Sequence, residues 1–171
     1  MTKHRFFLPS LIICALALIA WGGPRWNPSE SMPRGLYWLV PGSAQRGDIV
    51  ELCPPAPVAH YAREHGIVGR GLCAGWNGTL LKVLAGVAGD DVDFESRGVY
   101  VNGLLWPQSA PRPINAPFRA HGRHRLRKGE IVVLGLNPRS YDSRYFGAIP
   151  SASIVGRAFP LFTSHNGDIQ R

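Results

Sequence analysis

Lysine is rare in this sequence, and one lysine lies where a charged group is costly. Three of the 19 basic residues are lysines, and Lys82 lies in the middle of residues 80–84, which read LLKVL. Such an apolar run predicts a buried strand. A buried ammonium without a partner usually loses its proton, and a neutral lysine can act as a general base toward a serine hydroxyl. The alternative is that Lys82 reaches water from a sheet edge or pairs with Asp90, Asp91 or Asp93.

A proline-rich turn supplies serines that could react with such a base. Residues 28–35 read PSESMPRG, and their prolines and glycine exclude a regular helix or a central strand. Ser31 is therefore expected in an exposed turn with its backbone N–H free, which suits a nucleophile, and Ser29 could place a second hydroxyl beside it. Serines next to prolines also form ordinary surface turns, so this segment alone leaves both interpretations open.

The elements that must position these groups are mostly β-strands. The chain has 171 residues, 45% of them hydrophobic and 18% charged, which suits one folded domain and excludes both intrinsic disorder and a large multidomain protein. Its 20 glycines and 15 prolines favour turns over long helices. Asn102-Gly103 is a strong signal for a two-residue hairpin. Strands are predicted at residues 36–40, 49–52, 80–84, 92–94, 99–101, 131–134 and 154–159.

Two cysteines enclose a segment with no clear pattern. Between Cys53 and Cys73 the chain is rich in Pro, Gly and His with little periodicity, which predicts a loop without a core of its own. In an oxidising compartment a disulfide between them would stabilise this loop by about 3 kcal/mol. Two free thiols are the alternative. A metal site is less favoured, because His60 and His65 lack the compact Cys-x-x-Cys spacing.

The N-terminus has the pattern of a membrane anchor. Residues 6–21 are apolar apart from Pro9 and Ser10, and with the two glycines that follow they reach the lower limit for a spanning helix. Cys14 fits within this stretch as a small hydrophobe. No clean cleavage site follows, so an uncleaved anchor at residues 1–23 is favoured over a signal peptide, with residues 24–171 as the folded domain. The flanking charges set the orientation only weakly.

The basic charge suggests a function of another class. The net charge is +8, and residues 119–128 contain five of the basic side chains. A membrane-tethered module that binds nucleic acid or anionic lipid would carry such a segment. However, no aromatic residues for base stacking are interleaved there, and alternating Arg123, Arg125 and Arg127 are more simply the solvated face of an edge strand, with Leu126 pointing away. Nucleic acid is therefore not the expected partner.

Taken together, several motifs resemble the signal peptidase I superfamily of serine-lysine peptidases. The short chain, the segment SMPRGLYW at 31–38 and the cysteine pair resemble the conjugative-transfer peptidases within it. The resemblance implies a single N-terminal transmembrane helix followed by an antiparallel β catalytic domain on the periplasmic side of the cytoplasmic membrane. The motifs are the anchor, PSESMP at 28–33, GDIV at 47–50, LKVLAG at 81–86 with GD at 89–90, NG at 102–103 and SYDSRYFG at 140–147.

The resemblance also implies roles for the residues singled out above. Ser31 would be the nucleophile that forms an acyl-enzyme, and Lys82 would be the general base. The Ser29 hydroxyl and the backbone N–H of Ser31 would hold the oxyanion. This chemistry requires no metal and no organic cofactor.

A loop near the C-terminus would support the base. The resemblance implies that Ser140 orients the lysine amine, and that Asp142 and Arg144 buttress the loop that carries it.

The resemblance implies a serine endopeptidase that processes a pilin or another exported precursor in conjugative transfer. Its acyl-enzyme would be resolved either by water, which gives a linear product, or by the amine of the substrate itself, which gives a cyclic product. Membrane lipid around the anchor and the conjugation apparatus are the other expected partners. The alternative within the superfamily is a general type I signal peptidase. Departures from the housekeeping pattern, at Arg34-Gly35, Val83 and Leu136, weigh against this alternative.

Overall fold

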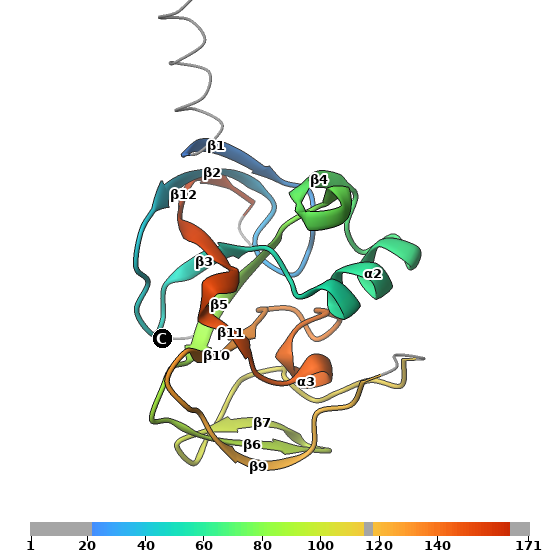
Figure 1. Cartoon of the computed structure of the whole chain (residues 1–171), viewed down its shortest axis with the longest axis vertical. Helices are drawn as coiled ribbons and strands as arrows, with labels where there is room; N and C mark the ends of the chain where they lie inside the picture. The colour runs from blue at the N-terminus through green and yellow to red at the C-terminus, as the bar shows by residue number, and fades with distance from the viewer. Residues whose placement is uncertain (1–21, 115–117, 165–171) are drawn as a thin grey trace, which may run out of the picture.

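Two antiparallel β-sheets dominate the structure, a computed structural model that describes residues 22–114 and 118–164 (Figure 1). The larger sheet has seven strands, in the order β1 (Gly23–Asn27), β2 (Gly35–Pro41), β12 (Ile154–Thr163), β3 (Ile49–Leu52), β5 (Leu80–Gly86), β10 (Glu130–Leu134) and β11 (Ile149–Pro150). The smaller sheet has four, in the order β8 (Leu104–Leu105), β7 (Gly98–Val101), β6 (Asp91–Glu95) and β9 (Gly122–Arg125). The predicted mostly β, antiparallel fold class is confirmed.

The strands form where the apolar runs predict them. Each of the seven predicted segments lies within a strand of the structure, extended by up to four residues. The hairpin at Asn102-Gly103 is confirmed as well, because Val101 pairs with Leu104 across it. Both turn residues have positive φ, 51° and 80°, as a two-residue hairpin of this type requires.

Strand alternation places Lys82 on a buried face of β5. One core cluster contains Leu80 and Leu84, and a second contains Ala85. Because side chains alternate along a strand, Lys82 shares its face with Leu80 and Leu84 and points toward the first core. The neighbouring strand β10 divides its side chains in the same way, so the apolar run 131–134 is buried on both faces.

The segment between the two cysteines is more ordered than its composition predicts. It contains helix α2 (Ala56–Glu64) and strand β4 (Arg70–Cys73), and the 3-10 turn η1 (Ala74–Trp76) follows it. The prediction of a loop without a core was wrong, because Val58, Tyr61 and Ala62 share one side of α2 and pack into the first core. The apolar pattern of this helix is short and begins beside a proline, a residue that is tolerated in the first helical turn.

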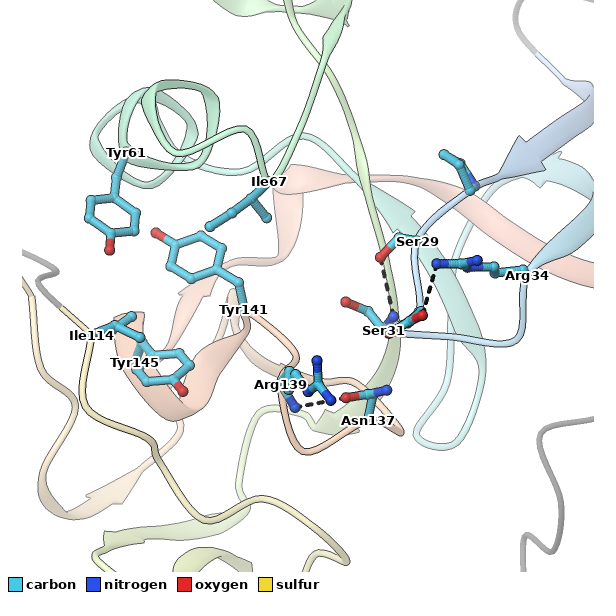
Figure 2. A pocket seen from close by; sticks show the side chains of 12 residues that line it. Ser29, Ser31, Arg34, Tyr61, Ile67, Ile114, Asn137, Arg139, Tyr141 and Tyr145 are labelled. Atoms are coloured by element: carbon cyan, nitrogen blue, oxygen red, sulfur yellow. Dashed lines mark hydrogen bonds and ion pairs between the residues drawn. The ribbon is translucent and has the colours of Figure 1, made fainter.

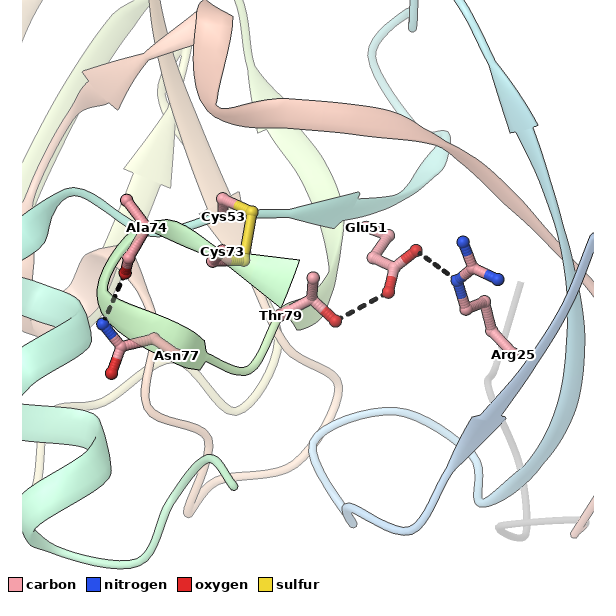
Figure 3. Close-up of a disulfide and its surroundings, with 7 residues drawn as sticks. All are labelled: Arg25, Glu51, Cys53, Cys73, Ala74, Asn77 and Thr79. Carbon is pink, nitrogen blue, oxygen red and sulfur yellow. Dashed lines mark hydrogen bonds and ion pairs between the residues drawn. A yellow bond between two sulfur atoms is a disulfide. The ribbon is translucent and has the colours of Figure 1, made fainter. Parts of the chain in front are cut away.

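A disulfide ties this segment to the larger sheet. Cys53, which directly follows β3, is bonded to Cys73 at the end of β4 (Figure 3). Beyond it, the Asn77 side chain donates to the Ala74 carbonyl at 2.8 Å and closes the turn. On the β3 side, the Glu51 carboxylate accepts from Thr79 Oγ1 at 2.6 Å and pairs with Arg25 at 3.1 Å. The segment is therefore held at both ends.

The arginine-rich segment forms the solvated edge that was predicted. β9 is an edge strand of the smaller sheet, and Arg123 and Arg125 pair across to Asp93 and Asp91 of β6 at 3.7 and 3.2 Å. Leu126 points away and is only 2% exposed. These contacts neutralise part of the basic surface within the sheet itself.

The predicted anchor lies almost wholly outside the described residues. Gly22 and Gly23 are described, and Gly23 already begins β1, one residue before the predicted start of the domain. Within residues 22–114 and 118–164, no helix is long and apolar enough to cross a membrane.

Candidate active site

Asn27 fixes the turn that carries the two serines. Its side-chain amide donates to the carbonyls of Ser29, Met32 and Pro33 at 3.0 to 3.2 Å, and its Oδ1 accepts from the Ser29 N–H at 3.1 Å. Met32 is fully buried below the turn, whereas Ser31 is partly exposed. The turn between β1 and β2 is thus rigid and presents Ser31 at the surface. Sequence reasoning missed Asn27, although an Asn before Pro-Ser is typical of a side-chain-stabilised turn.

Ser29 and Ser31 face each other at the edge of a cavity. The Ser31 N–H donates to Ser29 Oγ at 3.2 Å (Figure 2). Both residues line a cavity of about 390 Å³. The other lining residues come from the serine turn itself, from the α2 region, from two later loops and from the short helix α3 (Ser143–Phe146): Pro28, Glu30, Arg34, Tyr61, Ile67, Ile114, Asn137, Arg139, Tyr141 and Tyr145.

Lys82 is buried, which makes its neutral form more accessible than that of an ordinary lysine. It lies opposite Val50 on β3, is 2% exposed and makes no hydrogen bond to any residue of the described ranges. Burial lowers its pKa from 10.5 to about 8. The Asp142 charge opposes this shift and the Arg144 charge adds to it, so the pKa of Lys82 also reflects the ion pair those two residues form.

Lys82 neither reaches water from a sheet edge nor pairs with one of the three aspartates, so both alternatives to a buried base are wrong. The side chain does not reach water from an edge, because β5 lies between β3 and β10. The three aspartates proposed as partners are engaged elsewhere: Asp90 with Arg46, Asp91 with Arg125 and Asp93 with Arg123.

A buried ion pair organises the loop after β10. Arg144 Nε and one terminal nitrogen donate to the two carboxylate oxygens of Asp142 at 2.8 and 2.9 Å, and both side chains are fully buried. Asp142 also caps the short helix α3 (Ser143–Phe146) by accepting from the Arg144 N–H. The same guanidinium donates to the carbonyls of Gln108 and Pro138 at 2.9 and 3.1 Å. The pair therefore fixes the course of the loop.

This loop is bonded to the serine turn. The Leu136 N–H donates to the Ser31 carbonyl at 2.8 Å, and the Gly135 N–H donates to Asp142 Oδ2 at 2.8 Å. A Cβ atom on Gly135 would lie 2.9 Å from the Ser31 carbonyl oxygen and would clash with Ser140 Oγ. The structure thus brings the backbone of Ser31, Ser140 and Asp142 together around Gly135.

Ser140 has a buried hydroxyl without a partner. The residue is 1% exposed, and its Oγ forms no hydrogen bond within residues 22–114 and 118–164. A buried polar group in this state costs free energy. No hydrogen bond joins Lys82 to Ser31 or Ser140 in the described part of the chain, and Lys82 is not among the residues that line the cavity.

Metal-ligating side chains do not come together in the part of the chain that the structure describes. No group of three or more His, Cys, Asp and Glu residues is placed there to hold an ion.

Comparison with known proteins gives one consistent result. The family model described as signal peptidase, peptidase S26, matches residues 4–162. The plasmid transfer protein TraF of Escherichia coli is 34% identical over 163 residues, which cover 88% of this chain and 90% of that protein. The conjugal transfer protein TraF of Agrobacterium tumefaciens is 35% identical over 181 residues, covering 95% and 99%.

A solved structure also matches. A signal peptidase I from Enterococcus faecalis aligns with a TM-score of 0.40 and 24% identity over 69% of this chain and 98% of that one. The family model and the relatives above confirm the resemblance inferred from the sequence motifs. The chain therefore belongs to the signal peptidase family, peptidase S26.

Proposed function

We propose that the chain is a membrane-anchored serine endopeptidase in which Ser31 is the nucleophile and Lys82 is the general base. The observation that carries this proposal is the burial of Lys82, which lowers its pKa to about 8 and leaves an amine that is partly neutral near physiological pH. Membership of the family supports a serine peptidase. The partly exposed Ser31, held in a rigid turn that is bonded to the loop carrying Ser140, supplies a matching nucleophile.

The reaction follows from these groups. Neutral Lys82 accepts the proton of Ser31 Oγ as that oxygen bonds to the carbonyl carbon of the scissile peptide. The Ser31 N–H, which donates to Ser29 Oγ in this structure, would instead donate to the developing oxyanion, and the Ser29 hydroxyl would donate to it as well. The protonated lysine then gives its proton to the leaving amine as the C–N bond breaks. Water or another amine resolves the acyl-enzyme.

Two further features fit this chemistry. The unpaired Ser140 hydroxyl can accept from the Lys82 amine and aim its lone pair at Ser31, which would satisfy a buried group that otherwise has no partner. The Asp142–Arg144 pair then acts as a positioning device, because it holds the loop from Gly135 to Ser140 in place.

The substrate we propose is a pilin or another exported precursor in conjugative transfer, released as a linear or a cyclic product. The support is the set of relatives named as plasmid or conjugal transfer proteins. A general type I signal peptidase is the second candidate, supported by a probable signal peptidase I-2 of Synechocystis, 34% identical over 87 residues that cover 48% of this chain and 38% of that one.

We further propose that the domain lies on the periplasmic side of the cytoplasmic membrane, held by the N-terminal anchor and its contact with lipid, beside the conjugation apparatus. The Cys53–Cys73 disulfide supports an oxidising compartment. A nucleic-acid-binding module is disfavoured, because Arg123 and Arg125 already pair with acidic side chains of their own sheet.

The test is cleavage of a co-expressed pilin precursor by the wild-type chain, Ser31→Ala, Lys82→Met and Lys128→Ala, followed by intact mass of the product. Lys128 is the matched control, because it is an exposed lysine. Loss of cleavage in the first two variants only would support the Ser-Lys pair, and a product lighter by one water would indicate cyclisation. Unimpaired cleavage by either variant would remove that residue from the mechanism. An exported reporter with an Ala-x-Ala site separates the two substrate classes.

A further inference from the structure

The cavity beside Ser31 contains a charge that the proposed chemistry does not use. Arg139 lines this cavity, is exposed, and its guanidinium forms no hydrogen bond or ion pair with any other residue of the described ranges. The cavity's other charged residues neutralise each other, because Arg34 donates to Glu30 at 2.8 Å. The cavity therefore carries one uncompensated positive charge.

The position of Arg139 is fixed relative to the nucleophile. Its backbone N–H donates to Asn137 Oδ1 at 2.8 Å, and the buried guanidinium of Arg144 donates to the carbonyl of Pro138 at 3.1 Å. Three residues earlier, Leu136 is bonded to the Ser31 carbonyl. The loop that carries Arg139 is thus held between the buried ion pair and the serine turn, which lowers the entropy lost when its side chain binds a ligand.

We propose that Arg139 and this cavity form a subsite that binds a carboxylate of the peptide substrate within a few residues of the scissile bond. The assignment of the cavity to substrate rests on the proposed function of Ser31, which lines the same cavity. A guanidinium offers a planar fork of donors that matches a carboxylate in two hydrogen bonds. In the view of Figure 2, the Arg139 side chain lies between Ser31 and the tyrosines of the far wall, Tyr141 and Tyr145.

Two tyrosines line the same cavity as Arg139. Tyr141 and Tyr145 are largely buried and present aromatic surface to the cavity. Because Arg139 itself is exposed, its ion pair with a carboxylate is modest in strength and weakens as salt is added. The carboxylate could come from an Asp or Glu side chain or from the C-terminus of a short leaving segment, since both present the same two oxygens.

The test measures binding in the full-length chain in detergent, with Ser31→Ala so that no peptide is consumed. The probes are seven-residue peptides centred on Ala-Gln-Ala, with Glu or Gln at each outer position in turn, each as a C-terminal acid and as an amide. We expect at least one carboxylate peptide to bind about 2- to 5-fold more tightly than its neutral counterpart at low ionic strength, as one ion pair on an exposed arginine implies. The Glu and Gln series and the acid and amide forms distinguish the two sources.

The variants complete the design. Adding Arg139→Gln should abolish the preference, Arg139→Lys should restore part of it, and Lys128→Gln should leave it unchanged. Equal affinity for charged and neutral peptides, no binding of any peptide, or a preference that persists in Arg139→Gln would each overturn the subsite. The readout does not depend on catalysis, so inactivity of the unsubstituted chain toward precursors would contradict the proposed function without deciding this inference.

Discussion

The backbone N–H of Leu136 donates to the carbonyl oxygen of Ser31 at 2.8 Å, so the loop after β10 is joined directly to the turn between β1 and β2. Next to Leu136, the Gly135 N–H donates to the buried Asp142 carboxylate at 2.8 Å. The backbone of the proposed nucleophile is therefore connected to the Asp142–Arg144 ion pair through two adjacent peptide groups. A side chain at Gly135 would break this arrangement, because its Cβ would lie 2.9 Å from the Ser31 oxygen.

The activity of the chain should rise with pH. Burial lowers the pKa of Lys82 to about 8, so below that pH most of the lysine is protonated and cannot accept a proton from Ser31. We expect kcat/KM for the precursor to increase about tenfold per pH unit well below 8 and to reach a plateau above it. Lys128→Ala should keep the same profile. A rate that does not vary between pH 6 and about 9 would show that Lys82 is not the base.

Replacing Lys82 with Met should stabilise the fold at neutral pH. The unfolded chain holds the proton up to about pH 10.5 and the native chain only to about pH 8, so between these values the unfolded state binds more protons and wild-type stability rises with pH. Below pH 8 the native chain bears the full cost of burying the protonated lysine, which lowers the free energy of unfolding by about 3 kcal/mol. Lys82→Met removes it. Denaturant unfolding from pH 7 to about 10 measures this.

The matched control for that experiment is Lys128→Met, because Lys128 is exposed. Its stability should follow the wild-type curve at every pH. A Lys82→Met chain that is less stable than wild type at pH 7 would mean that the buried amine is stabilised by a partner, in conflict with its lowered pKa.

The local features of this fold could be read from the sequence. The seven predicted strands could be read because each contains a short apolar run bounded by turn residues, and Lys82 stood out because it interrupts such a run. Helix α2 was not predictable in the same way, since its buried residues are only Val58, Ala59, Tyr61 and Ala62, among prolines and polar residues. Its packing depends on the core that β3 and β5 provide.

The long-range contacts of the site could not be read from the sequence. No local pattern shows that the Leu136 N–H bonds to Ser31, or that Arg139 shares a cavity with it. β1 and β10 are not neighbours in the larger sheet, so the contact between the segments that follow them depends on the three-dimensional fold as a whole. The motifs supplied the candidate residues, whereas their arrangement required the fold.

Ser140→Ala should separate stability from activity. Its hydroxyl is buried and has no partner in the described part of the chain, so removing it should change the free energy of unfolding by no more than about 0.5 kcal/mol. Under the proposed mechanism kcat/KM should fall and the midpoint of its pH profile should move, because the lysine amine loses its acceptor. Thermal unfolding and pH-rate profiles measure the two effects.

A neighbouring serine provides the control. Ser143 Oγ accepts from the Val133 N–H at 3.0 Å in a buried setting. Ser143→Ala should therefore destabilise the chain by about 1 to 3 kcal/mol. If Ser140→Ala destabilises as much and leaves the pH profile in place, Ser140 has a structural role only.

The Asp142–Arg144 pair should show strong coupling in a double-mutant cycle. Asp142→Leu leaves the guanidinium buried without its partner, which costs about 3 to 5 kcal/mol, and Arg144→Met leaves the carboxylate in a similar state. The double variant should cost much less than the two single changes added together. Denaturant unfolding of the four chains gives the coupling energy. The exposed pair Asp91–Arg125 should couple by less than about 1 kcal/mol, and equal coupling in both pairs would contradict the role of burial.

Loss of the disulfide should loosen α2 before the sheets. The Cys53–Cys73 bond closes a loop with a sequence separation of 20, and replacing both cysteines with Ser should lower stability by about 3 kcal/mol. The sheets keep their own pairing, so hydrogen exchange should accelerate first in α2, for example at the Ala59 N–H that donates to Pro55. Reduction of the wild-type chain should give the same pattern. Uniform acceleration in α2 and β5 alike would show instead that the segment unfolds only together with the core.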